Sequence, residues 1–256
     1  MDEPVRIFND ASWVYRRAVS RGENVFIPTW GLGDVVTTLV GAAVVSLLAT
    51  LGFMASHIDP VNGWGLIATA SFPWIVLAGW PLLTAARKGN GAQLDLGLSA
   101  KQSHIRFGVL AGLGGLGIAF VAATVTQHFT GPIDSTAGLV SNRQHGLVLF
   151  VFALCTLFIA PVAEEIAFRG LLYTALAKSG LHEIACVVIS AGIFAMFHFE
   201  PQRFLILFAI GCVLGEVRRR TGTTSASIAT HMINNLPAAL GMLYSIVQPI
   251  LPFVNG

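Results

Sequence analysis

Apolar runs of about 20 residues recur along almost the whole chain, and charged or turn-forming residues separate them. Only 11% of the 256 residues are charged and 54% are hydrophobic, whereas an average soluble domain is roughly 25% charged. A bilayer core about 30 Å thick needs about 20 apolar residues per helix. The runs therefore predict an integral membrane protein with several spanning helices, and they exclude a water-soluble globular domain.

Seven runs are long enough to propose as spans, which predicts an all-α fold, a polytopic transmembrane helix bundle. The fifth and sixth runs are short, and only the turn at 200–203 separates them. The runs cover residues 35–57, 64–86, 104–127, 147–168, 183–199, 203–217 and 224–246.

Basic residues alternate between abundant and scarce in successive loops, which predicts an orientation. Counted from the N-terminus, the tails and loops hold 4, 0, 4, 1, 2, 1, 3 and 0 of the 15 Lys and Arg residues. By the positive-inside rule the N-terminus is cytoplasmic and, with seven spans, the C-terminus is outside. The first thirty residues lack the apolar core of a signal peptide, so we expect a retained cytoplasmic tail. Short loops favour a prokaryotic plasma membrane, with an internal eukaryotic membrane as the alternative.

A few polar side chains fall inside the apolar runs. These polar side chains are Glu164, Glu165, His198, His231 and Asn235. Inserting an ionisable group into the bilayer costs about 2.5–3.5 kcal/mol on insertion scales, so each ionisable one is a functional candidate. Carboxylates and imidazoles exchange protons, and an amide donates a hydrogen bond to a developing oxyanion. The set predicts an amide-hydrolysing site in an intramembrane cavity.

The two adjacent carboxylates cannot serve one site in the same way, because neighbouring side chains on a helix point about 100° apart. Glu165 stands four residues before Arg169, the spacing of an ion pair on one helix face. Glu164 is therefore the better candidate for the reactive carboxylate. Taken singly, the Glu165–Arg169 pair also fits a structural role, and His198 also fits an interhelical hydrogen-bond partner.

The depth of these residues constrains the fourth span. If its helix ended at Arg169, Glu164 would lie about 8 Å from the inner boundary and His198 about 25 Å from it. If the helix continues to Lys178, Glu164 moves to about 21 Å along it and comes level with His198. We therefore predict a long fourth helix and a water-accessible cavity open to the cytoplasm.

Three short motifs carry a resemblance to a known family. They are E-E-x-x-x-R at 164–169, F-x-x-x-H at 194–198 and H-x-x-x-N at 231–235, all complete and in this order. With these motifs the chain resembles the CAAX prenyl endopeptidases and bacterial bacteriocin-processing or self-immunity proteins, abbreviated CPBP. The resemblance covers residues 160–236, so the first three spans lie outside it.

The resemblance implies an intramembrane endopeptidase that hydrolyses a peptide bond in a membrane-embedded or lipidated protein or peptide. The resemblance implies that Glu164, His198 and His231 are catalytic, with Asn235, Glu165 and Arg169 supporting them. In a metal-free scheme, Glu164 and His198 activate water while His231 and Asn235 support the oxyanion.

Many members of the family are labelled metalloproteases, so a zinc-dependent route with Glu164, His198 and His231 as ligands is the alternative mechanism. No H-E-x-x-H helix occurs. We favour a metal-independent route without cofactors.

The apolar runs and the resemblance together divide the chain into a cytoplasmic tail at 1–34, N-terminal helices at 35–140, catalytic helices at 141–246 and a C-terminal tail at 247–256. The expected partners are membrane lipids and the substrate. Nucleic acid is not expected, because the net charge is only +2 and the basic residues are not clustered on a soluble domain. The competing functions are a non-enzymatic immunity or scaffold protein and a small proton-coupled transporter.

Overall fold

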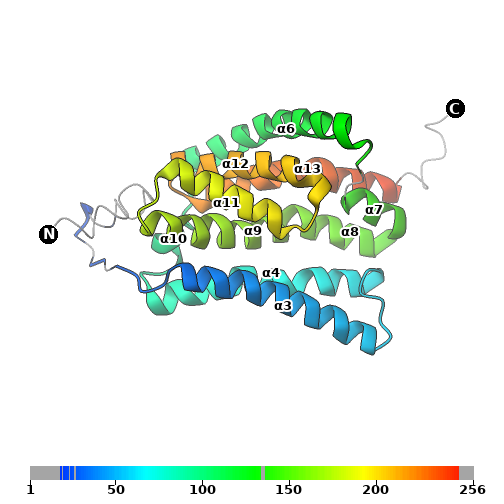
Figure 1. The fold of residues 1–256 in the computed structure, drawn as a ribbon, viewed down its shortest axis with the longest axis horizontal. Helices are drawn as coiled ribbons and strands as arrows, with labels where there is room; N and C mark the ends of the chain where they lie inside the picture. Colours follow the sequence, from blue (N-terminus) through cyan, green and yellow to red (C-terminus); the bar gives the residue numbers. More distant parts are fainter. Residues whose placement is uncertain (1–17, 19, 23, 26, 134–135, 248–256) are drawn as a thin grey trace.

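The structure is a computed structural model that describes residues 18, 20–22, 24–25, 27–133 and 136–247. Every regular element among these residues is helical, as Figure 1 shows. Most of the predicted N-terminal tail and all but residue 247 of the predicted C-terminal tail lie outside the described residues. The predicted all-α helix bundle is confirmed.

Among the described residues, seven long helices or helical rods and three short helices make up the bundle. The long ones are α3 (Leu32–Ala55), α4 (Gly63–Lys88), α6 (Gln102–Thr130), the rod Gly146–Lys178, α11 (Glu183–Phe197), α12 (Phe204–Thr221) and α13 (Thr224–Val247). The short ones are α5 (Ala92–Asp95), α7 (Thr136–Arg143) and the single turn η3 (Pro201–Arg203). The sequence did not predict α5 or α7.

The rod Gly146–Lys178 confirms the prediction of a long fourth helix. It consists of α8 (Gly146–Leu154), η1 (Cys155–Ile159), α9 (Ala160–Glu165), η2 (Ile166–Leu172) and α10 (Tyr173–Lys178), where η1 and η2 are π-helical. Pro161 lacks an N–H and disturbs the hydrogen bonds of the preceding turn, which is where η1 lies. Because π-helical turns are rare and often lie at functional sites, the stretch between them is a place to search.

The rod runs through the middle of the molecule. Helices α3 and α4 cover one side of it, and α11 and α13 cover the other (Figure 1). Helix α6 packs on the outside of α12 and α13. The residues between η1 and η2, which form α9, therefore lie between α4 and α13.

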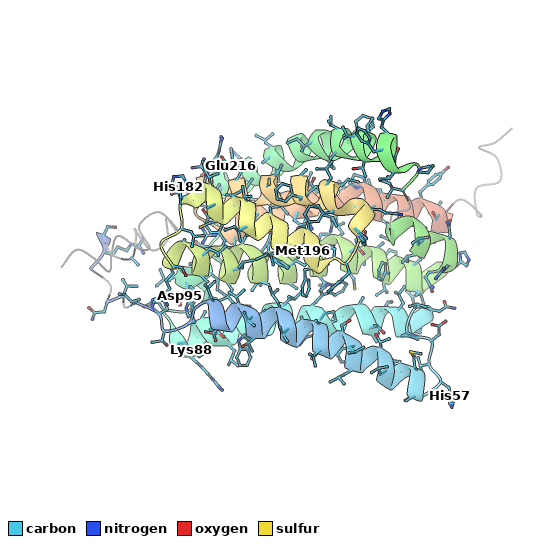
Figure 2. All side chains as sticks on the ribbon, viewed as in Figure 1. His57, Lys88, Asp95, His182, Met196 and Glu216 are labelled. Carbon is cyan, nitrogen blue, oxygen red and sulfur yellow. The ribbon has the colours of Figure 1, made fainter. Side chains whose placement is uncertain are left out.

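The predicted count of seven full spans needs correction at α11 and α12. In the part of the chain that the structure describes, four helical stretches are long and apolar enough to cross a bilayer: α3, α4, α6 and the rod. Helix α11 has 15 residues, about 22 Å, which is short of the bilayer core. Figure 2 shows Met196, near its end, at the middle of the long axis, whereas His182 lies near one end. Helices α11 and α12 therefore form a hairpin that turns near the middle of the long axis of the bundle, which we call mid-depth.

Helices α12 and α13 are not among the four candidate membrane spans, for different reasons. Helix α12 carries Glu216 and three arginines at 218–220, and α13 is long enough but rich in polar side chains. Both ends of the hairpin lie at the end of the molecule that holds Lys88, as His182 and Glu216 show in Figure 2.

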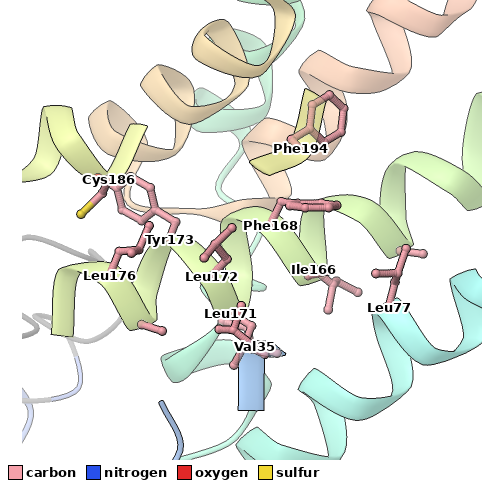
Figure 3. Close-up of a cluster of buried hydrophobic side chains, with 14 of the residues drawn as sticks. Val35, Leu77, Ile166, Phe168, Leu171, Leu172, Tyr173, Leu176, Cys186 and Phe194 are labelled. Atoms are coloured by element: carbon pink, nitrogen blue, oxygen red, sulfur yellow. The ribbon is translucent and has the colours of Figure 1, made fainter. Parts of the chain in front are cut away.

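Segment η2 packs against helices on both sides of the rod. Figure 3 shows Leu171 beside Val35 of α3 and Ile166 near Leu77 of α4. On the other side, the ring of Phe168 meets that of Phe194 edge-on, with 5.3 Å between centroids. The N-terminal helices thus bury one face of the rod, which holds η2 in place for the residues on its other face.

Small residues let α6 approach α13 closely. A Cβ added at Gly108 would come 2.3 Å from the carbonyl oxygen of Ala226, and one at Gly112 would come 2.7 Å from Cβ of Ile233. Thr230 also donates its hydroxyl to the Gly108 carbonyl oxygen at 2.8 Å. Close backbone approach through glycine is a common way for membrane helices to associate. This contact fixes the position of α13, which carries His231.

Polar contacts tie the start of α3 to the loop after α4 at the end that holds Lys88. The indole Nε1 of Trp30 donates to Oδ2 of Asp95 at 3.0 Å, and the ammonium of Lys178 donates to the carbonyl oxygen of Trp30. Burial raises the pKa of the Asp95 carboxyl, while hydrogen bonds from Trp30 and Asn90 oppose that rise. These contacts join the N-terminal helices to the end of the rod.

Candidate active site

Helix α9 places the two carboxylates on different surfaces of the rod. The side chain of Glu164 is 15% exposed, whereas that of Glu165 is fully buried. This difference follows from the turn of about 100° between adjacent residues. Glu164 is therefore the carboxylate that a substrate or water can reach.

Glu165 and Arg169 form the predicted ion pair. Nη1 of Arg169 lies 2.8 Å from Oε1 of Glu165, and both side chains are fully buried. Nη2 donates to the carbonyl oxygen of Gly211 on α12 at 2.9 Å, and the guanidinium lies 4.6 Å from the centroid of the Phe194 ring. Removing one partner of a buried ion pair would leave the other charge buried without a counter-charge, which is costly. Through the contacts of Arg169, the pair fixes the rod against α11 and α12.

Gly211 also lies where α12 runs very close to α11. A Cβ at Gly211 would lie 3.0 Å from both Cα and Cβ of Ala191. A second buried arginine, Arg218, donates Nε to the carbonyl oxygen of Arg169 at 3.0 Å. Helix α12 thus holds Arg169 through both its side chain and its backbone.

His198 directly follows α11. Its Nδ1 lies 2.8 Å from the carbonyl oxygen of Phe194, and its ring packs on the Phe194 ring with 4.5 Å between centroids. Its Nε2 lies 3.9 Å from Oε2 of Glu164, and the side chain is 24% exposed. The end of α11 at mid-depth is what brings His198 level with Glu164.

His231 approaches the same carboxylate from α13. Its Nε2 lies 3.8 Å from Oε2 of Glu164, and its Nδ1 lies 2.9 Å from Oε1 of Glu165. The residue is only 4% exposed. His231 therefore contacts both carboxylates, one through each ring nitrogen.

Asn235 lies one turn after His231 on α13. Its Nδ2 donates to the carbonyl oxygen of Thr156 in η1 at 2.9 Å. An amide nitrogen carries two hydrogens, so this bond leaves one available for another acceptor. The structure thus places Nε2 of His198 and of His231 each within 4 Å of Oε2 of Glu164. It holds Asn235 against η1, the π-helical segment that precedes Glu164 in the chain.

The hydrogen-bond partners assign a tautomer to each neutral imidazole. A carbonyl oxygen and a carboxylate oxygen only accept, so Nδ1 donates in His198 to Phe194 and in His231 to Glu165. Each Nε2 then carries a lone pair directed at Glu164. Distances of 3.8 and 3.9 Å exceed a direct hydrogen bond, but one water can bridge them. The group can therefore polarise a water and take up its proton.

Glu164, His198 and His231 are residue types that bind zinc, but their spacing does not form a ready metal site. Within the described part of the chain, no group of three or more His, Cys, Asp and Glu side chains could hold a metal ion. Two cavities are resolved elsewhere, one beside α6 and one beside the turn at 199–204. The predicted water-accessible cavity at Glu164 stays a prediction.

The sequence did not reveal that Glu165 contacts His231, because 66 residues separate them. It also missed Gly211 and Arg218, which stand outside the three motifs. The only signal for these residues was the presence of charge and glycine within an apolar stretch. Such signals are too common in membrane helices to assign a role.

Residues 146–237 match the family model described as Type II CAAX prenyl endopeptidase Rce1-like. The matched segment begins with the rod, ends within α13 and contains all three motifs. Comparisons with curated proteins and with solved structures gave no match. The family match supports the predicted resemblance to the CAAX proteases.

Proposed function

We propose that this protein, whose segment 146–237 carries an Rce1-like CAAX protease domain, hydrolyses a peptide bond in a membrane-associated or lipidated substrate by water activated at Glu164 and His198. The family indicates an intramembrane endopeptidase, and the apolar helices make the chain an integral membrane protein. The residue roles, the substrate and the metal-free route are our proposal.

One observation carries the proposal: the Nε2 atoms of His198 and His231 converge on Oε2 of Glu164. Glu164 and neutral His198 are proton acceptors that can hold and deprotonate a water molecule beside His231. The partial exposure of Glu164 and His198 gives a substrate a route to that point. A purely structural cluster would not need two imidazoles facing one carboxylate without direct hydrogen bonds.

The reaction follows from these positions. The water oxygen attacks the peptide carbonyl carbon while its proton passes to the Glu164–His198 pair. A tetrahedral oxyanion forms and is stabilised by the free Nδ2 hydrogen of Asn235 and by His231, which is protonated before the attack and so donates from Nε2 without taking the water proton. The C–N bond then breaks, and the stored proton goes to the leaving amine nitrogen. The products are a carboxylic acid and an amine.

Glu165 supports His231 in this scheme. Its buried carboxylate accepts from Nδ1 of His231 and so holds the ring with Nε2 directed at the oxyanion. Arg169 pairs with the same oxygen of Glu165 and fixes its orientation. We therefore assign Glu165 and Arg169 to positioning, and neither touches the substrate.

The count of available groups favours a metal-independent route. If Glu164, His198 and His231 all bound zinc, Glu165 would be the remaining nearby carboxylate for a general base. Glu165 is fully buried and already bonded to Arg169 and His231. The metal-free scheme has a group for each step.

The test is cleavage of fluorogenic membrane peptides by the purified protein in proteoliposomes. We expect turnover by wild type and by Glu183→Gln, a control carboxylate that pairs with Arg219 away from the group. We expect Glu164→Ala to be inactive although folded. Cleavage that is equal in wild type and Glu164→Ala would contradict the proposal. Proton transport or partner binding without any cleavage would favour the transporter or immunity alternatives.

A further inference from the structure

Segment η2 departs from α-helical hydrogen bonding at the carbonyl group of Arg169. The N–H of Tyr173 donates to the carbonyl oxygen of Phe168, five residues back. In an α-helix the same N–H would donate four residues back, to the carbonyl oxygen of Arg169. The π-helical bond therefore bypasses the carbonyl of a fully buried residue. A buried carbonyl oxygen that its own helix bypasses requires a donor from elsewhere.

Arg218 on α12 supplies that donor. Its Nε donates to the carbonyl oxygen of Arg169 at 3.0 Å, and its Nη2 donates to Oγ1 of Thr174 at 3.4 Å. The guanidinium lies 5.5 Å from the centroid of the Tyr173 ring, and the residue is fully buried. The side chain of Arg218 thus lies at the junction between π-helical η2 and α-helical α10.

A loop outside the segment that matches the family model closes around this guanidinium. A Cβ added at Gly97 would come 3.1 Å from Nη2 of Arg218 and 3.2 Å from the carbonyl oxygen of Gly222. Gly97 also has a φ of 66°, a conformation that favours glycine. Beside it, the hydroxyl of Thr224 donates to the carbonyl oxygen of Leu96 at 2.6 Å. Arg218 therefore cannot leave η2 unless this end of the bundle opens.

The two buried arginines form a reciprocal clamp, in which each guanidinium donates to the backbone of the other helix. Nη2 of Arg169 donates to the carbonyl oxygen of Gly211, while Nε of Arg218 donates to the carbonyl oxygen of Arg169. Gly211 and Arg218 are seven residues apart, so their Cα atoms are separated by about 10 Å along α12. Two separated bonds fix both the height and the rotation of the rod against α12.

We infer that Arg218 is a positioning residue for the proposed reaction: by donating to the bypassed carbonyl oxygen, it holds η2 in its π-helical form and so keeps Glu165 against His231. A π-helical segment holds an extra residue relative to an α-helix, and one residue corresponds to about 100° of rotation. If η2 relaxed to an α-helix, the rod before it would turn and carry Glu165 away from His231. The inference rests on the proposed function, which gives that contact its catalytic value.

The test compares two uncharged replacements that differ in one donor. Arg218→Gln places an amide nitrogen where arginine has Nε, whereas Arg218→Met places a methyl group there. Both variants remove the charge, so the donor distinguishes them. Arg220→Met is the matched control, since Arg220 lies on the same helix, has a side chain that is 59% exposed and pairs with Glu216.

The first readout does not depend on hydrolysis. It is the Nδ1–H signal of His231 in NMR spectra of the purified protein labelled with ¹⁵N-histidine, in lipid nanodiscs. The chain has seven histidines, and His231→Gln identifies the signal. We expect Arg218→Met to lose this signal, because its Glu165 partner moves away. Wild type, Arg218→Gln and Arg220→Met should keep it at the same chemical shift.

The second readout is peptide cleavage per folded molecule. We expect Arg218→Met to lower kcat at least about 10-fold at unchanged KM, because a small displacement of catalytic groups slows the chemical step. Arg218→Gln should stay within about 3-fold of wild type. A residue that only stabilised the fold would lower the folded fraction and leave kcat per folded molecule equal in the two variants.

The possible outcomes separate the inference from the proposed function. Loss of the His231 signal in both the Gln and the Met variants, or in neither, overturns the inference. If Arg218→Met does not fold, Arg218→Lys replaces it in the comparison. A signal kept in Arg218→Gln then supports the donor role, and a signal kept only in Arg218→Lys overturns it in favour of the charge. If wild type cleaves no peptide but Arg218→Met alone loses the signal, the positioning of His231 stands and the proposed hydrolysis fails.

Discussion

Nδ1 of His231 on α13 donates to the buried Oε1 of Glu165 over 2.9 Å, while Nη1 of Arg169 donates to the same oxygen over 2.8 Å. One carboxylate thus joins the rod to α13 and also satisfies a buried cation. Its neighbour Glu164 has neither bond and faces the two Nε2 atoms. The two adjacent glutamates therefore have different tasks, which mutations can separate.

Glu164→Gln should lower kcat by at least about 100-fold, because the amide keeps the volume but cannot accept a proton. The melting temperature should stay close to that of wild type, since Glu164 is partly exposed and outside the buried ion pair. Peptide cleavage and thermal unfolding in the same detergent check both expectations.

Glu165→Gln should behave differently and destabilise the protein by about 3–5 kcal/mol, because Arg169 is left as a buried charge without its carboxylate. Combining it with Arg169→Met should recover part of the lost stability. The measurement is denaturant unfolding of both single variants and the double variant. Intact stability for Glu165→Gln, together with full inactivation, would show that the roles of Glu164 and Glu165 are assigned wrongly.

Gly112→Val should separate α6 from α13 and cost about 1–3 kcal/mol through overpacking, since even its Cβ would come 2.7 Å from Ile233. Activity should fall as well, because α13 carries His231. Gly117→Val is the matched control on the same helix, where an added Cβ meets nothing within 4 Å. Similar losses for both variants would point to a general effect of valine in α6.

The α11–α12 hairpin predicts a labelling pattern that seven full spans do not. In a background without the three native cysteines, a cysteine at position 57 should react with an impermeant thiol reagent added outside intact cells. A cysteine at position 88 should react only after the cells are opened, and one at position 203 should react poorly from either side. Strong external labelling at 203 would show that α11 and α12 both cross the bilayer.

Activity should survive exhaustive treatment with strong chelators, and the purified protein should carry far less than one zinc per chain. The reason is that Glu164, His198 and His231 already fill the steps of the metal-free scheme. Elemental analysis and activity before and after chelation are the measurements. Stoichiometric zinc, with activity lost on chelation and restored by the metal, would reverse the mechanism and leave the protease assignment intact.

The sequence by itself determined the membrane class, the long rod and the separation of Glu164 from Glu165. These features depend on local quantities, namely the length of apolar runs and the fixed rotation between neighbouring helix residues. The same local rules gave the Glu165–Arg169 pair, because i,i+4 neighbours meet on any helix. The three motifs also indicated the family.

The tertiary structure decided which residues meet across the bundle. Three features depend on how helices distant in sequence pack. They are the contact of His231 with Glu165, the hydrogen bond from Arg169 to the Gly211 carbonyl oxygen, and the end of α11 at mid-depth. Hydrophobic runs do not encode that packing, because lipid and protein interiors are similarly apolar and close approach depends on small residues such as Gly112 and Gly211. The sequence already shows that the apolar run of α11 is short. Only the packed structure shows that the end of this helix brings His198 to Glu164.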